Sequence, residues 1–319
     1  MDFISALIIF LNAGFLSAIV ARFTGANMTI LILCSLLYAG AAPLEAAGIM
    51  MTFIVFMRLT MYTQHHPVNY KEFQIFRGWR LAIPVVLILA GLFFYPFAAL
   101  AIFLAFFISE LLYRIYHEMP KERRMAPSAL AGYAAVASVI TAVSFAVVSF
   151  IPETWYYGIA GTAILLLCVF FWWVGQNRRR LAGAWDTVIL ASFIPAGLFG
   201  FDLSDWIEDM RRSTGTSRLA YNLPFIFLPA FFVGFVAANV LFGIFSFSGL
   251  ILTFFAALAI RLFGYYQMSG RGKTNLVAIA MTALAAVCLF LTAPEPANIS
   301  HAIDVVLPAQ PVSDLFQLF

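Results

Sequence analysis

Residues 14–52 read GFLSAIVARFTGANMTILILCSLLYAGAAPLEAAGIMMT, and they contain a polar interruption in an otherwise apolar run. The interruption includes three polar residues and one glycine, namely Arg22, Thr24, Gly25 and Asn27. The apolar run that follows, residues 28–37, is too short to cross a bilayer, because a spanning helix needs about 20 residues. We therefore expect residues 28–37 to be one arm of a hairpin that enters the membrane and turns back by Pro43.

A broken helix at membrane depth predicts a binding site. Polar backbone groups are tolerated there only where they are buried in protein or line a cavity, and the N–H groups at the start of the second arm attract anions. The planar guanidinium of Arg22 suits an oxyanion; the alternative is a side chain that extends to the outer interface. Thr24 and Asn27 fit either a ligand site or helix capping. We expect the substrate-binding residues to be Arg22, Thr24, Gly25, Asn27 and, on the next span, Thr52.

The composition indicates a polytopic membrane protein. Of the 319 residues, 63% are hydrophobic and only 10% are charged, and the mean hydropathy is +0.96, a balance that soluble domains do not have. The net charge of +3 is too small to indicate a nucleic-acid partner. The three cysteines lie singly in apolar runs without the spacing of metal ligands, and we expect no cofactor.

The fold class expected is an all-α polytopic membrane protein. Full spans are predicted at residues 43–62, 79–96, 97–117, 128–150, 154–175, 223–243, 245–265 and 275–293. Two further segments, 3–42 and 184–221, contain charged interruptions and fit a simple span less well. Basic loops lie at residues 58–80, 114–124, 178–180, 211–218 and 271–273, and the other loops have almost no Lys or Arg.

The basic loops predict the topology. All of them lie on the cytoplasmic side only if neither 3–42 nor 184–221 makes a net crossing. The chain then divides into a first repeat at 1–127, linking helices at 128–183, a second repeat at 184–293 and a C-terminal tail at 294–319. Each repeat is a re-entrant hairpin plus three transmembrane helices, and the two repeats have inverted topology, as in many secondary transporters.

The second hairpin has polar residues of its own. Gly200, Asp202 and Ser204, followed by Asp205, occupy the place that corresponds to the first break, and a carboxylate beside an anion path is suited to carry a coupling proton. The alternative is that Asp202 belongs to a solvated, charged helix at the membrane surface, with residues 205–212. Arg58, near the end of its span, is interpreted as an anchor at the inner leaflet.

The pattern of residues 14–52 resembles that of the TauE/SafE family of sulfite and organosulfonate exporters. The matching residues are Gly14-Phe15-Leu16-Ser17-Ala18, Ala21, Thr24-Gly25 and the turn Gly40-Ala-Ala-Pro43-Leu-Glu-Ala46-Ala47-Gly48. The glycines that the family has at the break are reduced here to Gly25, and Asp202-Leu203-Ser204 stands where the second break of the family has glycines. The resemblance implies an exporter of small sulfur oxyacids without specifying the anion.

These observations favour a secondary transporter over an enzyme. We expect export of sulfite or a sulfonate such as sulfoacetate by alternating access, driven by a proton gradient or the membrane potential. The alternatives are a membrane-embedded enzyme for a lipid-linked substrate, using the acidic stretch 202–209 with a divalent metal, and an assembly subunit. The expected setting is a bacterial inner membrane. The expected partners are the lipid bilayer and a small anion, with a homodimer left open and nucleic acid excluded.

Overall fold

The computed structural model describes residues 3–66, 73–176, 184–212, 219–243, 247–264 and 276–292, and every regular element in these ranges is a helix. Six helical stretches are long and apolar enough to cross a membrane. The first, Ala6–Thr24, runs through α1 (Phe3–Leu11), a π-helical segment (Asn12–Leu16) and α2 (Ser17–Thr24). The others are α4 (Pro43–His65), α6 (Pro96–Glu118), α7 (Pro127–Val148), α8 (Glu153–Gln176) and α12 (Pro224–Phe242). The all-α class is confirmed, and the six apolar helices indicate a multi-pass membrane protein.

The remaining α-helices are shorter, and they are α3 (Met28–Tyr38), α5 (Ala82–Phe94), α9 (Trp185–Ala191), α10 (Phe193–Phe199), α11 (Ser204–Arg212), α13 (Phe247–Phe263) and α14 (Leu276–Thr292). Each of the eight spans expected from the sequence contains one helix. Three of these helices are shorter than the about 20 residues of a typical span: α5 has 13 residues, and α13 and α14 have 17 each. The predicted C-terminal tail, 294–319, lies outside the described residues.

Proline and glycine set many of the helix ends. The helices α4, α6, α7 and α12 begin with proline, whose fixed φ and missing N–H suit the first helical position. The helices α2 and α10 end at Gly25 and Gly200, which have φ values of 76° and 67°. This left-handed conformation favours glycine, because a Cβ atom is strained there. The chain can therefore leave both helices abruptly inside the bundle.

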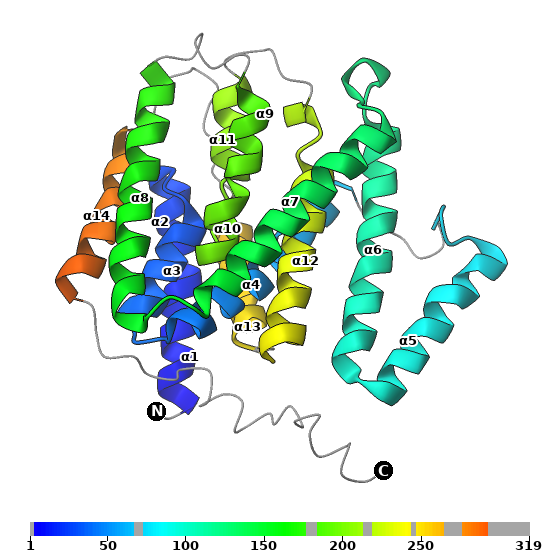
Figure 1. The fold of residues 1–319 in the computed structure, drawn as a ribbon, viewed down its shortest axis with the longest axis horizontal. Helices are drawn as coiled ribbons and strands as arrows, with labels where there is room; N and C mark the ends of the chain where they lie inside the picture. Colours follow the sequence, from blue (N-terminus) through cyan, green and yellow to red (C-terminus); the bar gives the residue numbers. More distant parts are fainter. Residues whose placement is uncertain are drawn as a thin grey trace.

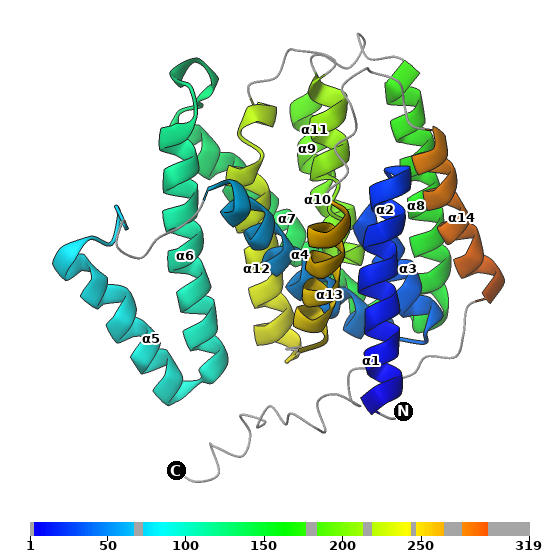
Figure 2. The ribbon, with the colours of Figure 1, turned by 180° about the vertical axis from the view of Figure 1, so that it is seen from behind.

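Helix α4 is the most enclosed of the six long helices. In its most apolar stretch of 18 residues, 78% of the residues are buried. The helix packs against α12 and α13. The helix α7 packs on α10 and α12, and α8 packs on α14 (Figure 1). The helices α5 and α6 form one edge of the molecule (Figure 1 and Figure 2). The outer face of α5 is apolar and exposed, as expected of a surface in contact with lipid.

Two segments turn back inside the bundle (Figure 1). In this view α1 and α2 rise from the lower end, the chain breaks after Thr24, and α3 returns to the lower end. The helices α9 and α10 descend from the upper end, the chain breaks after Phe199, and α11 returns to the upper end. Both turning segments fall within the stretches that were expected to make no net crossing. The breaks between their arms bring loop backbone into the interior, and this is where the polar residues gather.

Candidate functional site

The first break is built around Asn27. Gly25 ends α2, and the Asn27 side chain caps α3 by accepting a hydrogen bond from the backbone N–H of Ile30 at 3.2 Å. The Thr29 hydroxyl donates to the same Asn27 oxygen at 2.7 Å. Both Asn27 and Thr29 are buried, at 5% exposure each. A cap of this kind satisfies N–H groups that would otherwise lack a partner at the start of a helix.

The second break repeats this design with a carboxylate. Gly200 ends α10, and the Asp202 side chain accepts hydrogen bonds from the backbone N–H and the hydroxyl of Ser204, at 3.0 and 2.6 Å. Ser204 is the first residue of α11. The side chains of Asp202 and Ser204 are both buried, at 4% exposure. The carboxylate thus lies at the start of α11, where the helix dipole favours negative charge.

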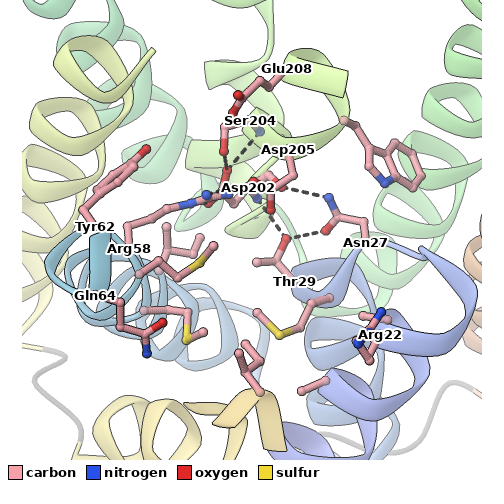
Figure 3. A pocket seen from close by; sticks show the side chains of 18 of the residues that line it. Arg22, Asn27, Thr29, Arg58, Tyr62, Gln64, Asp202, Ser204, Asp205 and Glu208 are labelled. Atoms are coloured by element: carbon pink, nitrogen blue, oxygen red, sulfur yellow. Dashed lines mark hydrogen bonds and ion pairs between the residues drawn. The ribbon is translucent and has the colours of Figure 1, made fainter. Parts of the chain in front are cut away.

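Hydrogen bonds join the two breaks, although they lie about 175 residues apart in the sequence (Figure 3). The Asn27 amide donates to the Asp202 carbonyl oxygen at 2.8 Å, and the Asp202 backbone N–H donates to the Thr29 hydroxyl at 2.9 Å. The Trp206 indole N–H donates to the Gly25 carbonyl oxygen at 3.3 Å. These bonds satisfy backbone groups that the breaks remove from the helical pattern, as unwound backbone inside a membrane protein requires.

Arg58 of α4 connects the second break to the centre of the bundle. Its Nε forms an ion pair with the Asp202 carboxylate, and its Nη1 donates to the Asp205 carboxylate at 2.9 Å. Arg58 is 6% exposed. The interpretation of Arg58 as an inner-leaflet anchor is therefore wrong, because its guanidinium turns inward to two carboxylates. The alternative interpretation of Asp202 as a solvated surface residue is wrong for the same reason.

A cavity of about 1000 Å³ adjoins both breaks. One part of its wall is polar and includes Asn27, Thr29, Arg58, Asp202, Ser204 and Asp205. Another part is apolar and includes Met28, Phe53, Ile54, Met57, Met61 and Ile260. The charged side chains among its described lining are Arg22, Arg58, Arg261, Asp202, Asp205 and Glu208. The volume and the mixture of many apolar with a few convergent polar groups are typical of a binding site for a small molecule.

The structure brings together five of the eight residues predicted for the site, because Arg22, Gly25, Asn27, Asp202 and Ser204 line this cavity. Arg22 lies away from the Asp202 cluster (Figure 3). Its Nε donates to the Phe263 carbonyl oxygen at 2.8 Å, at the end of α13. A cation at this position compensates the negative end of the helix.

The other three predicted residues are not among the described lining of the cavity. The Thr24 hydroxyl donates to the Val20 carbonyl oxygen at 2.7 Å and accepts from Ala26 N–H at 3.1 Å, which is a local role at a helix end. The expectation that Thr52 faces the cavity is wrong, because its side chain is fully buried where α4 meets Gly249 of α13. Gly200 packs against Met50 so closely that a Cβ atom would lie 2.3 Å from the Met50 Cβ.

Three residues of the site were not predicted for it: Thr29, Arg58 and Trp206. A signal was present for Arg58, which has apolar neighbours, Met57 and Leu59, on both sides. An arginine inside a span is costly unless it is paired, so it predicts a buried acidic partner. No comparable signal marks Thr29, whose role depends on the position of the second break.

Comparison with protein-family models, with curated proteins and with solved structures gives no match for this chain. The resemblance of residues 14–52 to TauE/SafE exporters therefore stays a prediction.

Within the described ranges, no group of three His, Cys, Asp or Glu side chains is placed to hold a metal ion.

Proposed function

We propose that the protein is a secondary transporter that moves a small organic or inorganic anion by alternating access. The observation that carries the proposal is the pair of helix breaks that bind to each other beside a cavity of about 1000 Å³. Broken helices that meet near the middle of a bundle are the usual substrate and ion sites of secondary transporters. The six apolar helices supply the membrane setting that this function requires.

The donors of the polar wall favour an anion. The helices α3 and α11 both begin at the breaks. Their first residues, Met28 and Ser204, line the cavity. Helix N-termini and guanidinium groups bind oxyanions. Sulfite, or a sulfonate such as sulfoacetate, is the substrate that the resemblance of residues 14–52 suggests. The transport direction proposed with it is export from a bacterial cell across the inner membrane.

The two turning segments support the inverted-repeat arrangement that we propose for 1–127 and 184–293. Each segment has a left-handed glycine at its break, Gly25 or Gly200, and an Asn or Asp two residues later that caps the following helix or turn. The segments enter from opposite ends of the bundle (Figure 1). A rocking motion of the repeats about their shared breaks would open the cavity to one side at a time.

The alternative functions have less support. An enzyme that uses a divalent metal at the acidic stretch 202–209 needs carboxylates that are available to the metal. Asp202 and Asp205 instead form ion pairs with Arg58. For an assembly subunit, the described residues offer no specific observation.

The proposal is tested by uptake of radiolabelled sulfite and sulfoacetate into proteoliposomes. Wild type is compared with Thr29→Val, which keeps the size of the side chain and removes the hydroxyl between the breaks. We expect uptake by wild type and at least about tenfold slower uptake by the variant. The variant loses the neutral hydrogen bond to Asn27, worth about 1 kcal/mol, and leaves the buried backbone N–H of Asp202 without its acceptor. Thr282→Val, buried on α14 and bonded within its own helix, is the matched control.

Two outcomes would contradict the proposal. The first is an absence of flux for both anions from correctly folded wild-type protein. The second is equal flux in the Thr29→Val and Thr282→Val variants, because the contact between the breaks would then have no part in transport.

A further inference from the structure

We infer that the start of the α5 arm binds the headgroup of an anionic phospholipid through Arg77 and Arg80. These two arginines flank Gly78 and Trp79, and the four residues are hereafter the Arg77–Arg80 corner. All four are exposed, on the edge of the molecule that α5 and α6 form (Figure 1). The inference goes beyond the proposed function, because it concerns this edge and not the cavity between the breaks.

A buried carboxylate fixes the segment that leads into the corner. Glu110 of α6 is 1% exposed, and its two oxygens accept the backbone N–H groups of Gln74 and Ile75, at 2.6 and 3.0 Å. The ring of Phe76 packs edge-on against Phe106, with the ring centroids 4.7 Å apart. Since a buried carboxylate needs such donors, this contact is costly to break. The corner that follows it is therefore held at a fixed level along α6.

This level lies below the upper end of the bundle in Figure 1. The chain leaves α4 beside the upper end of α6, where His66 forms an ion pair with Glu118. Glu110 precedes Glu118 by two turns of α6, so it lies about 12 Å lower along the helix. The chain thus descends along α6 before the α5 arm begins, and α5 starts well below the top of α6 (Figure 1).

The length of the arm, residues 78–94, is close to the thickness of the apolar part of a membrane. The arm consists of a 3₁₀ turn (Gly78–Leu81) and α5, which together span about 28 Å. The hydrocarbon core of a bilayer is about 30 Å thick. If the turn between α5 and α6 at Tyr95 lies at one boundary of this core, the corner lies close to the other boundary. Long arginine side chains extend to the headgroups from there.

The side chains of the corner suit a phosphate group. Guanidinium groups bind phosphate through paired, charge-assisted hydrogen bonds. Trp79 is 77% exposed, and tryptophan is favoured at the level of the headgroups. Residues 73–109 contain Arg77 and Arg80 as their charged residues and no acidic residue. The stretch is therefore positively charged where it meets the membrane surface.

The rest of the arm suits the acyl chains of the same lipid. Below the corner, Ile83, Val86 and Leu89 follow one another along α5 at helical spacing, and they are 46%, 60% and 60% exposed. A lipid bound at the corner can place its phosphate on the arginines and its chains along this strip. A phosphatidylcholine headgroup carries a cation beside its phosphate, which the arginines repel. The corner should thus prefer a lipid with net negative charge, as basic residues next to a membrane do.

The test measures how strongly brominated lipids quench the fluorescence of Trp79 in vesicles that contain the full-length protein. Because the chain has six tryptophans, the Trp79 signal is the difference between each protein and the same protein with Trp79→Phe. Brominated phosphatidylglycerol, as a minor component in phosphatidylcholine, is compared with the same amount of brominated phosphatidylcholine. For wild type we expect the site to prefer phosphatidylglycerol about tenfold, from two contacts between arginine and phosphate.

Two double variants separate the corner from general surface charge. Arg77→Gln/Arg80→Gln removes both guanidinium groups from exposed positions, and the preference is expected to fall to less than about twofold. Lys121→Gln/Arg123→Gln removes the same charge from another exposed turn, after α6, and is expected to keep the full preference.

The inference is overturned if the two brominated lipids quench Trp79 of wild type equally, or if folded Arg77→Gln/Arg80→Gln keeps the preference. An equal loss in Lys121→Gln/Arg123→Gln overturns it as well, because attraction would then come from the whole surface. Displacement of the lipid by water-soluble glycerol phosphate would show an ion site and no lipid site. Stronger quenching by bromine near the ends of the acyl chains than by bromine near the glycerol would place the corner away from the headgroups. The measurement uses no transported substrate, so its result is independent of the proposed function.

Discussion

The first break, residues 25–27, and the second, residues 200–202, have the same backbone plan and different chemistry. Each starts with a left-handed glycine and ends with a side-chain oxygen that accepts a backbone N–H near the start of the next helix. Asn27 also has an amide N–H, and it uses this donor to bind the other break directly. Asp202 can only accept when ionised, so it requires a donor from elsewhere, and Arg58 is that donor. The difference between an amide and a carboxylate thus decides whether a break needs a cation from another helix.

The largest expected effect concerns the cation that only the second break needs. Arg58→Leu leaves the buried Asp202 carboxylate without its ion pair, and loss of one partner of a buried pair costs about 3–5 kcal/mol. We expect a large fall in thermal stability in detergent. The matched variant Arg22→Leu removes a partly exposed guanidinium that caps α13, and its cost should stay below about 1 kcal/mol.

A second variant checks the cause of the Arg58 effect. In Arg58→Leu/Asp202→Asn the buried charge of Asp202 is gone and only the more exposed Asp205 has lost its partner, so a substantial part of the lost stability should return. Equal losses in the single and double variants would show that packing of the arginine, rather than its charge, stabilises the second break.

A smaller effect is expected from replacing the left-handed glycine, a feature that each break has. Gly200→Ala is strained at φ +67° and places its Cβ 2.3 Å from the Met50 Cβ. Strain in the left-handed region costs about 1–2 kcal/mol, and overpacking adds about 1–3 kcal/mol. Gly243→Ala has a similar φ of +64° with nothing within 4 Å, so it should show the strain alone. Unfolding midpoints of the two variants measure the difference, and identical midpoints would be inconsistent with a crowded second break.

The smallest expected effect tests the amide of the first break. Asn27→Ala removes the cap of α3 and the donor to the Asp202 carbonyl oxygen, which together are expected to cost about 2 kcal/mol. Asn27→Asp keeps the acceptor for Ile30 N–H but loses the donor, so it separates the two contributions. Thr24→Ala, which removes two local bonds at the end of α2, should cost about 0.5 kcal/mol. An Asn27→Asp variant as stable as wild type would show that the contact between the breaks contributes little.

Much of the chain was predictable from local patterns. The apolar runs identified all eight expected spans as helices, and Gly25 and Asn27 marked the first break correctly. Gly200, Asp202 and Ser204 marked the second break. The residues that failed were those whose roles depend on a distant partner. Thr52 is a small polar residue on α4, and only the position of α13 shows that it packs against Gly249.

The two arginines illustrate the same limit. Arg22 follows an apolar helix and precedes a break, and it was predicted as a binding residue; it lines the cavity, but its Nε donates to the end of α13, away from the Asp202 cluster. Arg58 precedes a basic loop and was interpreted as an anchor, but it lies buried between two carboxylates. A hydropathy pattern records how apolar a segment is, and it does not record which way a long side chain turns. That choice depends on the free energy of pairing with groups far away in the chain.

The amino-acid sequence by itself determined the helical class, the membrane setting, the places where the helices end and the positions of both breaks. These properties follow from apolar length, from the left-handed freedom of glycine and from local capping, which all act within a few residues. The tertiary structure alone decided that Asn27 and Thr29 meet the backbone of Asp202, and that Arg58 balances its carboxylate. Buried polar groups must find partners wherever the fold provides them, so their pairing is a property of the assembled bundle.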